Sequence, residues 1–216
     1  RLGSRVALEK AHAKDLLAVK SSLITAREIA VLLDDHPEVE AHFSSLSERC
    51  GVLKDLVDLL DRSILEEPAI LINEGNLIKP GFDEKLDRLR DVKENARRVL
   101  KGYLEEEREK TGIPSLKLKY NKIIGYFLEV SKSNLKSVPQ YFIRRQTLVG
   151  GERFSTEALS NMESEIHNAS EQIVELERRH FLEVRSAVRE QLDGILTISE
   201  VLSELDVLQS FAFAAT

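Results

Sequence analysis

The sequence predicts a mainly α-helical protein, in which a helical core and a long antiparallel helix pair carry a small four-stranded β tip. Two long stretches keep the narrow apolar stripe of packed helices. Between them, about 45 residues alternate apolar and polar side chains as strands do. We therefore expect residues 1–81 to form part of the core, 82–114 the first long helix, 115–155 the β-rich part, and 156–216 the returning helix and the end of the core.

The N-terminal part reads as core helices joined by loops. Apolar residues recur at helical spacing from about Asp15 to Leu33, and a second helix is expected from about Leu46 to Leu60. The stretch DDHPEVE (Asp34–Glu40) lies between them, and its proline breaks the pattern. EEPAILINEGNLIKPGF (Glu66–Phe82) contains turn residues and short apolar runs, which predict a compact loop with a short strand pair.

Three further helices follow from apolar spacing and end signals. The first runs from about Phe82 to Lys110 and ends at TGIP (Thr111–Pro114), which supplies a terminal glycine and then a proline. The second begins at Thr156, a good N-cap residue, and runs to about Glu190. LDG (Leu192–Gly194) is the expected break before a last helix from Ile195 to Ala215.

The two long helices carry matching stripes, so we expect them to pack as an antiparallel pair with the intervening segment at its far end. The alternative is that each helix packs separately onto a globular body. Both arrangements agree with the spacing alone.

The intervening segment predicts two hairpins. In Ser115–Asn134, apolar residues alternate with lysines, a turn follows at NKIIG (Asn121–Gly125), and the next strand points Tyr126, Leu128 and Val130 to the core. In IRRQTLVGGERFST (Ile143–Thr156), alternation is interrupted by a Gly-Gly pair and then resumes. Four short strands are therefore expected.

Charge is separated along the chain. Residues 115–153 carry eight bases against two acids, a net +6, while the whole chain carries −6; the remainder therefore carries −12. The functional interpretation is contact with a polyanion, most simply a nucleic-acid backbone. The alternative is that lysines on edge strands only discourage aggregation.

The two turns are the expected contact points, because each brings a base next to a glycine whose backbone N–H can approach a phosphate. Neither turn offers an aromatic stacking platform, which favours duplex over single-strand binding. Adjacent strand residues face opposite ways, so at most one of the two neighbouring arginines should reach the same surface. The expected contacts are Asn121, Lys122, Gly150, Gly151 and Arg153, with Arg144 and Arg145 as weaker candidates.

The chain lacks the patterns of common catalytic sites. The phosphate-binding motifs G-x-x-x-x-G-K-[ST] and G-x-G-x-x-G do not occur. The five histidines are not paired at metal-ligand spacing, and the single cysteine, Cys50, is expected to be buried. We therefore expect no enzyme activity and no cofactor in this chain. The apolar runs are too short for a membrane span, and no signal peptide is evident, so we expect a cytosolic protein. The missing initiator methionine and the apolar C-terminal pattern suggest a piece of a longer protein.

Five stretches carry a family resemblance. Three of them are Tyr120–Asn134, Val138–Ile166 and Glu204–Ala212, and the other two are Arg1–Leu8 and Ile78–Arg90. The first three resemble the lever and clamp region of the MutS family of DNA mismatch-repair proteins, and the other two resemble its core region. The resemblance extends over essentially the whole chain.

The resemblance implies that lever helices connect an ATPase domain, absent here, to a clamp that holds duplex DNA by non-specific backbone contacts. For the full-length protein it implies bound ATP and Mg²⁺, a homodimer, MutL as a repair partner, and a bacterial cytoplasmic location at the nucleoid during repair. One departure concerns QTLVGGERF (Gln146–Phe154), where family members often have a Lys-Asn pair at Val149 and Gly150; side-chain contacts are not expected there. The other hypothesis is a helical protein-interaction module with a coiled-coil-like arm, which the salt dependence of duplex binding would distinguish.

Overall fold

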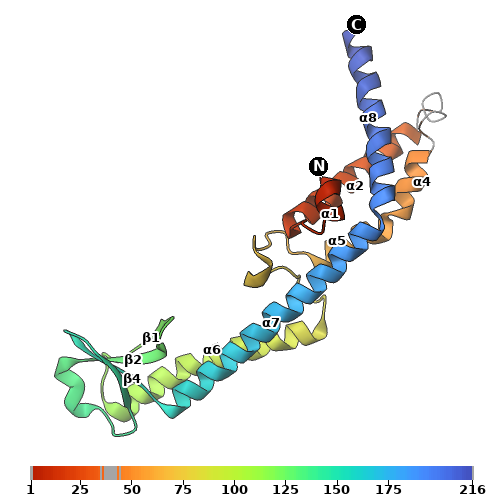
Figure 1. Cartoon of the computed structure of the whole chain (residues 1–216). Coiled ribbons are helices and arrows are strands. Elements are labelled where there is room, and N and C mark those ends of the chain that lie inside the picture. Colours follow the sequence, from red (N-terminus) through yellow and green to blue (C-terminus); the bar gives the residue numbers. More distant parts are fainter. Residues whose placement is uncertain (1, 35, 37–42, 44, 216) are drawn as a thin grey trace. The chain divides into compact units, whose positions relative to one another are not determined.

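The computed structural model describes residues 2–34, 36, 43 and 45–215. It is mainly helical with one four-stranded antiparallel sheet (Figure 1), which confirms the predicted fold class. The chain divides into two compact units. Unit 1 comprises Arg1–Asp83 and Val174–Thr216, and unit 2 comprises Glu84–Ile173. The finer division into four parts stays a prediction.

Unit 1 is helical. Its helices are α1 (Leu2–Ala7), α2 (Ala13–Asp34), α4 (Ser45–Val52), α5 (Lys54–Ser63), the second half of α7 (Glu157–Glu190) and α8 (Leu192–Ala214). The helix predicted from Asp15 to Leu33 is confirmed as α2. The helix break predicted at Pro37 lies outside the described residues.

Two predicted helix limits in unit 1 are wrong. The single helix expected from Leu46 to Leu60 is divided into α4 and α5 at Leu53, whose φ and ψ are −89° and 6° and whose side chain is buried. Gly51, a poor helix former, lies two residues before Leu53. The break expected at Leu192–Gly194 occurs one residue earlier, at Gln191, so Gly194 lies within α8.

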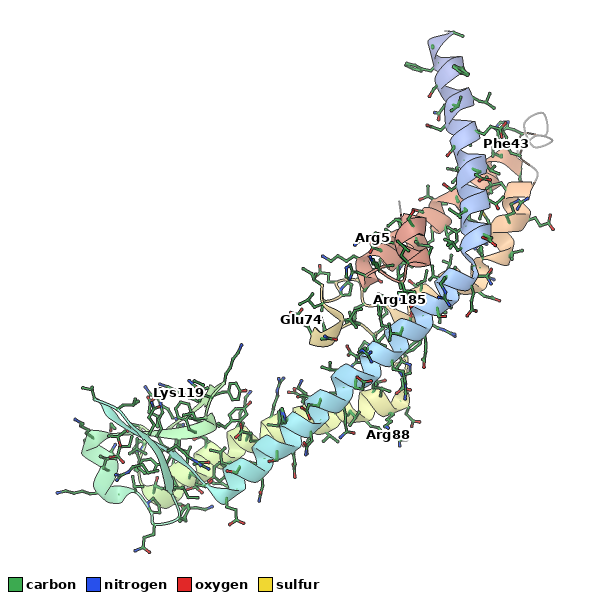
Figure 2. The ribbon with its side chains drawn as sticks, in the orientation of Figure 1. Arg5, Phe43, Glu74, Arg88, Lys119 and Arg185 are labelled. Carbon is green, nitrogen blue, oxygen red and sulfur yellow. The ribbon has the colours of Figure 1, made fainter. Side chains whose placement is uncertain are left out.

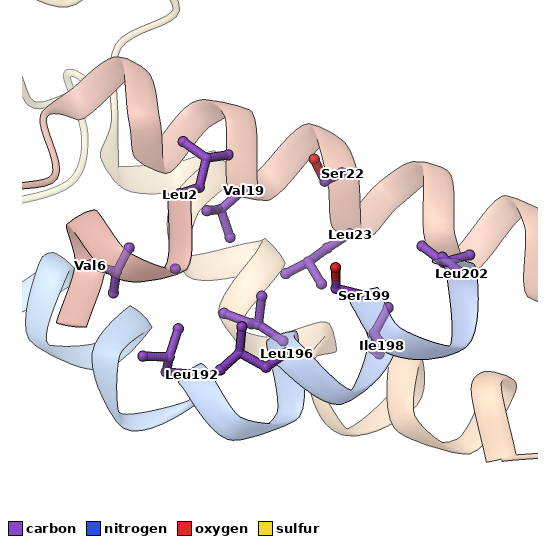
Figure 3. A pocket seen from close by; sticks show the side chains of 12 residues that line it. Leu2, Val6, Val19, Ser22, Leu23, Leu192, Leu196, Ile198, Ser199 and Leu202 are labelled. Atoms are coloured by element: carbon purple, nitrogen blue, oxygen red, sulfur yellow. The ribbon is translucent and has the colours of Figure 1, made fainter. Parts of the chain in front are cut away.

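The loop before unit 2 is held by backbone hydrogen bonds. The expected strand pair is reduced to one antiparallel bridge, between Ile64 and Ile78, with a 3-10 turn, η1 (Ile72–Glu74), between them. The backbone N–H of Leu77 donates to Oε2 of the buried Glu177 on α7, at 2.8 Å. An open apolar pocket of about 450 Å³ lies between α1, α2 and α8 (Figure 3), lined by side chains such as Val6, Leu23 and Leu196.

Unit 2 contains one α-helix of its own, a short 3-10 helix, a sheet and the first half of α7. Its elements are α6 (Glu84–Thr111), β1 (Lys117–Asn121), β2 (Gly125–Ser131), η2 (Lys132–Ser137), β3 (Ile143–Thr147) and β4 (Gly151–Ser155). Both long helices are confirmed to within two residues of their predicted ends.

Within unit 2, α6 and α7 pack side by side (Figure 1), and their directions are antiparallel. Tyr103, near the end of α6, has its hydroxyl 2.6 Å from Oγ1 of Thr156, immediately before α7. Thr156 is the N-cap, since the same Oγ1 accepts a hydrogen bond from the Leu159 N–H at 3.1 Å. Ala96, which precedes Tyr103 on α6, and Ile166, which follows Thr156 on α7, belong to one apolar cluster.

The sheet has the strand order β1-β2-β4-β3, and all neighbouring strands are antiparallel. One face packs on the helices through Leu128, Val130 and Phe154, as the alternation predicted for β2. Phe127 is also buried, although it points to the opposite face. Sequence alternation did not predict this second buried position.

Candidate nucleic-acid interface

The two predicted contact turns lie at opposite ends of the sheet (Figure 1). In the β2–β4 ladder, Gly151 at the start of β4 pairs with Ser131 at the end of β2, whereas the β1–β2 turn precedes Gly125 at the start of β2. Strand β2 is seven residues long, so roughly 20 Å separates the two turns at ~3.3 Å per residue. The predicted site residues therefore form two groups.

The β1–β2 turn presents one basic side chain, Lys122, that has no ion-pair partner among the described residues. Asn121 stabilises the turn itself, because its Oδ1 accepts a hydrogen bond from the Ile123 N–H at 2.8 Å. Gly125 adopts φ +75°, and a side chain there would overlap the Glu163 carboxylate on α7. Lys122 is exposed, and its side chain makes no ion pair or hydrogen bond with any residue that the structure describes. Lys122 is therefore free to bind an anion.

The β3–β4 turn has one open glycine and one closed glycine. Gly151 is buried, and a Cβ atom there would overlap the Val130 carbonyl oxygen. Gly150 is exposed with open space where a side chain would be, and its carbonyl accepts a hydrogen bond from the Lys132 N–H at 3.2 Å. Close strand packing explains Gly151, and only Gly150 is open to a ligand.

Arg153 is committed to contacts within the sheet. Its Nη1 donates to Oε1 of Gln146 at 2.8 Å, and its guanidinium lies 4.5 Å from the centre of the Phe127 ring. It also lies 3.7 Å from Glu129, which accepts a hydrogen bond at 2.7 Å from Lys119, labelled in Figure 2. The hydrogen bond from Lys119 holds the pKa of Glu129 below its usual value. Arg153 therefore covers Phe127 and completes this face.

The neighbouring arginines have different environments. Arg144 pairs with Glu152 at 2.7 Å and lies across from Phe154. A register shift then places both Arg145 and Gln146 opposite Arg153, as in a β-bulge. Arg145 is exposed and, like Lys122, makes no side-chain ion pair or hydrogen bond within the described part of the chain. Arg145 is the more accessible of the two.

A cluster of polar side chains beside Gly150 was not predicted. Asn134 of η2 donates through Nδ2 to the hydroxyls of Ser115, at 2.8 Å, and Ser131, at 3.2 Å. Both serines line a pocket of about 260 Å³ together with Lys117 and Gly150. Hydroxyl groups and a lysine can bind phosphate oxygens. The serines and asparagine in SKSN (Ser131–Asn134) were the available sequence signal.

The sequence predicted that neither turn offers an aromatic ring on which a base could stack. The turn residues themselves are not aromatic, but Tyr120, immediately before the β1–β2 turn, is 60% exposed. The alternation of β1 favoured a core position for this residue. Strand β1 extends beyond the apolar cluster of unit 2, so Tyr120, its last residue on the core-facing side, is exposed to solvent.

The described residues contain no group of three or more His, Cys, Asp or Glu side chains that could hold a metal ion. Among the same residues, no helix is both long enough and apolar enough to span a bilayer. Cys50 is buried, as predicted, and burial raises the pKa of its thiol.

Comparison with known proteins bears on the family of the chain. Residues 81–172, nearly the same as unit 2, match the model of MutS family domain IV. The chain is 43% identical over 216 residues to the DNA mismatch repair protein MutS of Treponema denticola, covering all of this chain and 24% of that protein. The MutS proteins of Treponema pallidum (strain Nichols) and Geobacillus kaustophilus are 45% and 42% identical, over 100% and 98% of this chain and 24% of each relative. The chain thus spans about a quarter of the length of these relatives. It belongs to the MutS family, and residues 81–172 are its domain IV.

Proposed function

We propose that this chain is a DNA-binding part of a mismatch-repair protein, and that the β-rich part of unit 2 holds duplex DNA through its phosphate backbone. The observation that carries the proposal is the set of cations left over after the internal ion pairs. Between residues 115 and 153 there are only two acids, and Glu129 and Glu152 are already paired with Lys119, Arg153 and Arg144. The exposed cations that make no side-chain ion pair or hydrogen bond with the described residues are Lys117, Lys122, Lys132, Lys136 and Arg145.

The placement of Lys122 and Gly150 suits contact with the phosphate backbone of DNA and does not suit recognition of base edges. Lys122 lies at one end of the sheet, and Gly150 lies at the other, roughly 20 Å away. On duplex DNA, with ~3.4 Å of rise per nucleotide in each strand, such a span covers several phosphates. Contacts to phosphate fix position without reading sequence. Matched and mismatched duplexes should therefore bind this chain with equal affinity.

About three or four neutralised phosphates give a slope of log affinity against log salt of roughly −3. The dissociation constant should lie in the non-specific range of about 10⁻⁴ to 10⁻⁶ M. Fluorescence anisotropy with labelled matched and mismatched duplexes, between about 50 and 200 mM salt, measures both quantities.

A matched pair of double variants tests the assignment. Lys122→Ala with Arg145→Ala removes two uncommitted cations of the sheet, and should weaken binding to every duplex and flatten the salt slope by about two units. Arg98→Ala with Lys101→Ala removes the same charge from exposed positions on α6 and should leave the slope unchanged. Equal binding by both variants would contradict the proposal. Duplex binding that is absent or insensitive to salt would favour the protein-interaction module.

For the full-length protein we propose the wider family properties. These are an ATPase domain outside this chain that uses ATP and Mg²⁺, a homodimer, MutL as a repair partner, and action in the bacterial cytoplasm at the nucleoid. The relatives' name, DNA mismatch repair protein MutS, supports the repair role. This chain itself is proposed to bind no cofactor and to hydrolyse no ATP, since no phosphate-binding glycine motif occurs in it. Nucleotide turnover by the purified chain above a buffer control would contradict that.

A further inference from the structure

The β1–β2 tip has an aromatic surface beyond the core. Along one face of the β1 segment, Leu116 is fully buried, Leu118 is half-buried and Tyr120 is 60% exposed. Tyr120 pairs across the strands with Tyr126, and their ring centres are 4.9 Å apart with an interplanar angle of 56°. Tyr126 packs against the apolar cluster of unit 2. Tyr120 is thus supported on one side by a fixed ring and is open to solvent on another.

A cation lies next to this surface in the chain. Lys122 follows Tyr120 by two residues, and its side chain has no partner among the described residues. Ile123, at the apex of the turn, is 92% exposed and adds apolar surface. Proteins that bind single-stranded nucleic acid combine an exposed aromatic ring, on which a base stacks, with a nearby positive charge for the phosphate. The tip contains both components.

We propose that this tip binds an unpaired nucleobase, which stacks on the Tyr120 ring while Lys122 contacts a neighbouring phosphate. The ligand class is single-stranded DNA, or a duplex that is locally opened. The inference goes beyond duplex backbone binding and does not depend on it, because a stacked base is a contact that a closed duplex does not offer. Sequence preference should be weak, since every base has a π-face.

The competing explanation is that the tyrosine pair only stabilises the hairpin. Cross-strand aromatic pairs do contribute to sheet stability. That role requires the two rings to touch each other and gives no preference for a ligand with bases. The two explanations therefore differ in what the tip discriminates, and a ligand without bases separates them.

The first experiment compares two probes on the unmodified chain. One is oligo(dT) of about 12 nucleotides, within the ~4–16 nucleotides that single-strand-binding folds cover, and the other is an abasic oligonucleotide of the same length. The chain has four tyrosines and no tryptophan, so tyrosine emission can be observed directly. We expect oligo(dT) to quench this emission and to bind at least about five-fold more tightly than the abasic strand, as base–aromatic stacking requires. Equal affinity for the two probes would overturn the proposal.

The second experiment uses variants of Tyr120. Tyr120→Leu keeps an apolar side chain but removes the ring, and should lower the affinity for oligo(dT) to that of the abasic strand. Tyr120→Phe keeps the ring and should bind oligo(dT) as the parent does. If the leucine variant binds oligo(dT) like the parent, the ring has no role in binding. Thermal unfolding checks each variant, and the two-probe comparison on the parent decides the question if the leucine variant fails to fold.

The duplex measurement separates this inference from the proposed function. Tyr120→Leu should leave duplex affinity and its salt slope unchanged, because the backbone cations remain. Loss of duplex binding by the Lys122 and Arg145 variant, with oligo(dT) still preferred over the abasic strand, would support both. Preference for oligo(dT) in a chain that does not bind duplex would support only the stacking site.

Discussion

At the scale of residues, Arg153 shows how a basic side chain can serve the sheet that carries it. Its guanidinium covers the buried Phe127 ring and donates to Gln146. We expect Arg153→Ala to lower the free energy of unfolding by about 1–2 kcal/mol, because it removes a cation–π contact and a hydrogen bond. Arg145→Ala, the exposed neighbour, should change it by less than about 0.5 kcal/mol. Urea unfolding measures both, and equal effects would contradict the structural role of Arg153.

Tyr141 gives a residue-level test that depends on pH. Its hydroxyl donates to Oε2 of the buried Glu107 at 2.7 Å, and burial together with this carboxylate raises the pKa of Tyr141 to about 12. An unfolded tyrosine loses its proton near pH 10, so the folded state holds a proton there that the unfolded state releases. The stabilisation from this group is therefore present below pH 10 and is lost as pH rises toward 12.

Tyr141→Phe removes that titration. We expect the free energy of unfolding of the parent to fall more steeply between about pH 10 and 12 than that of the phenylalanine variant. Burial also raises the pKa of Tyr103, which both proteins retain, so the difference between them isolates Tyr141. Parallel pH profiles from urea unfolding at several pH values would show that the hydroxyl of Tyr141 is not coupled to folding.

At the scale of elements, the β3–β4 hairpin depends on one of its two glycines. A Cβ atom at Gly151 would overlap the Val130 carbonyl oxygen, whereas a Cβ atom at Gly150 meets nothing within 4 Å. We expect Gly151→Ala to lower the free energy of unfolding by about 1–3 kcal/mol, since β4 must shift away from β2. Gly150→Ala should change it by less than about 0.5 kcal/mol. Thermal unfolding of the matched pair tests this, and a neutral Gly151→Ala would mean that the strands separate at no cost.

The elements also show what sequence alone could predict. The helices α2, α6 and α7 follow from repeated apolar spacing and capping residues, which are local properties. The break at Leu53 could not be predicted, because the apolar spacing is the same whether the helix continues through this buried leucine or bends there. Both hairpins followed from alternation.

The arrangement of the site could not be read in the same way. The order β1-β2-β4-β3 places the two predicted turns at opposite ends, and no local pattern encodes that order. For the same reason the internal contacts of Arg153 and the exposure of Tyr120 were not predicted, since both depend on which strand lies beside which. The basic residues could be picked out from composition. Only the structure showed which of them form internal ion pairs or hydrogen bonds and which do not.

At the scale of the whole molecule, unit 2 is a continuous stretch with its own core. Its apolar cluster draws only on residues from Ala96 to Ile166. We expect a fragment spanning residues 81–174 to fold alone, because every side chain of this cluster lies within it. Circular dichroism and dispersed amide NMR signals would report this. A fragment that stays unfolded under conditions where the 216-residue chain is folded would show that unit 2 depends on unit 1.

Unit 1, in contrast, is assembled from two stretches separated by about 90 residues, and this has a consequence for synthesis on the ribosome. The ion pair of Glu9 with Arg189 and the hydrogen bond from Leu77 to Glu177 join residues 180 and 100 positions apart. At ~5–20 residues per second, the first stretch waits several seconds for its partner to emerge. Phe82 and His180, which flank unit 2 in the chain, have ring centres 5.4 Å apart. If unit 2 folds before residues 174–216 leave the ribosome, the loop that must close to bring the two stretches of unit 1 together is effectively shorter. The order in which the units emerge would then affect the yield of folded protein.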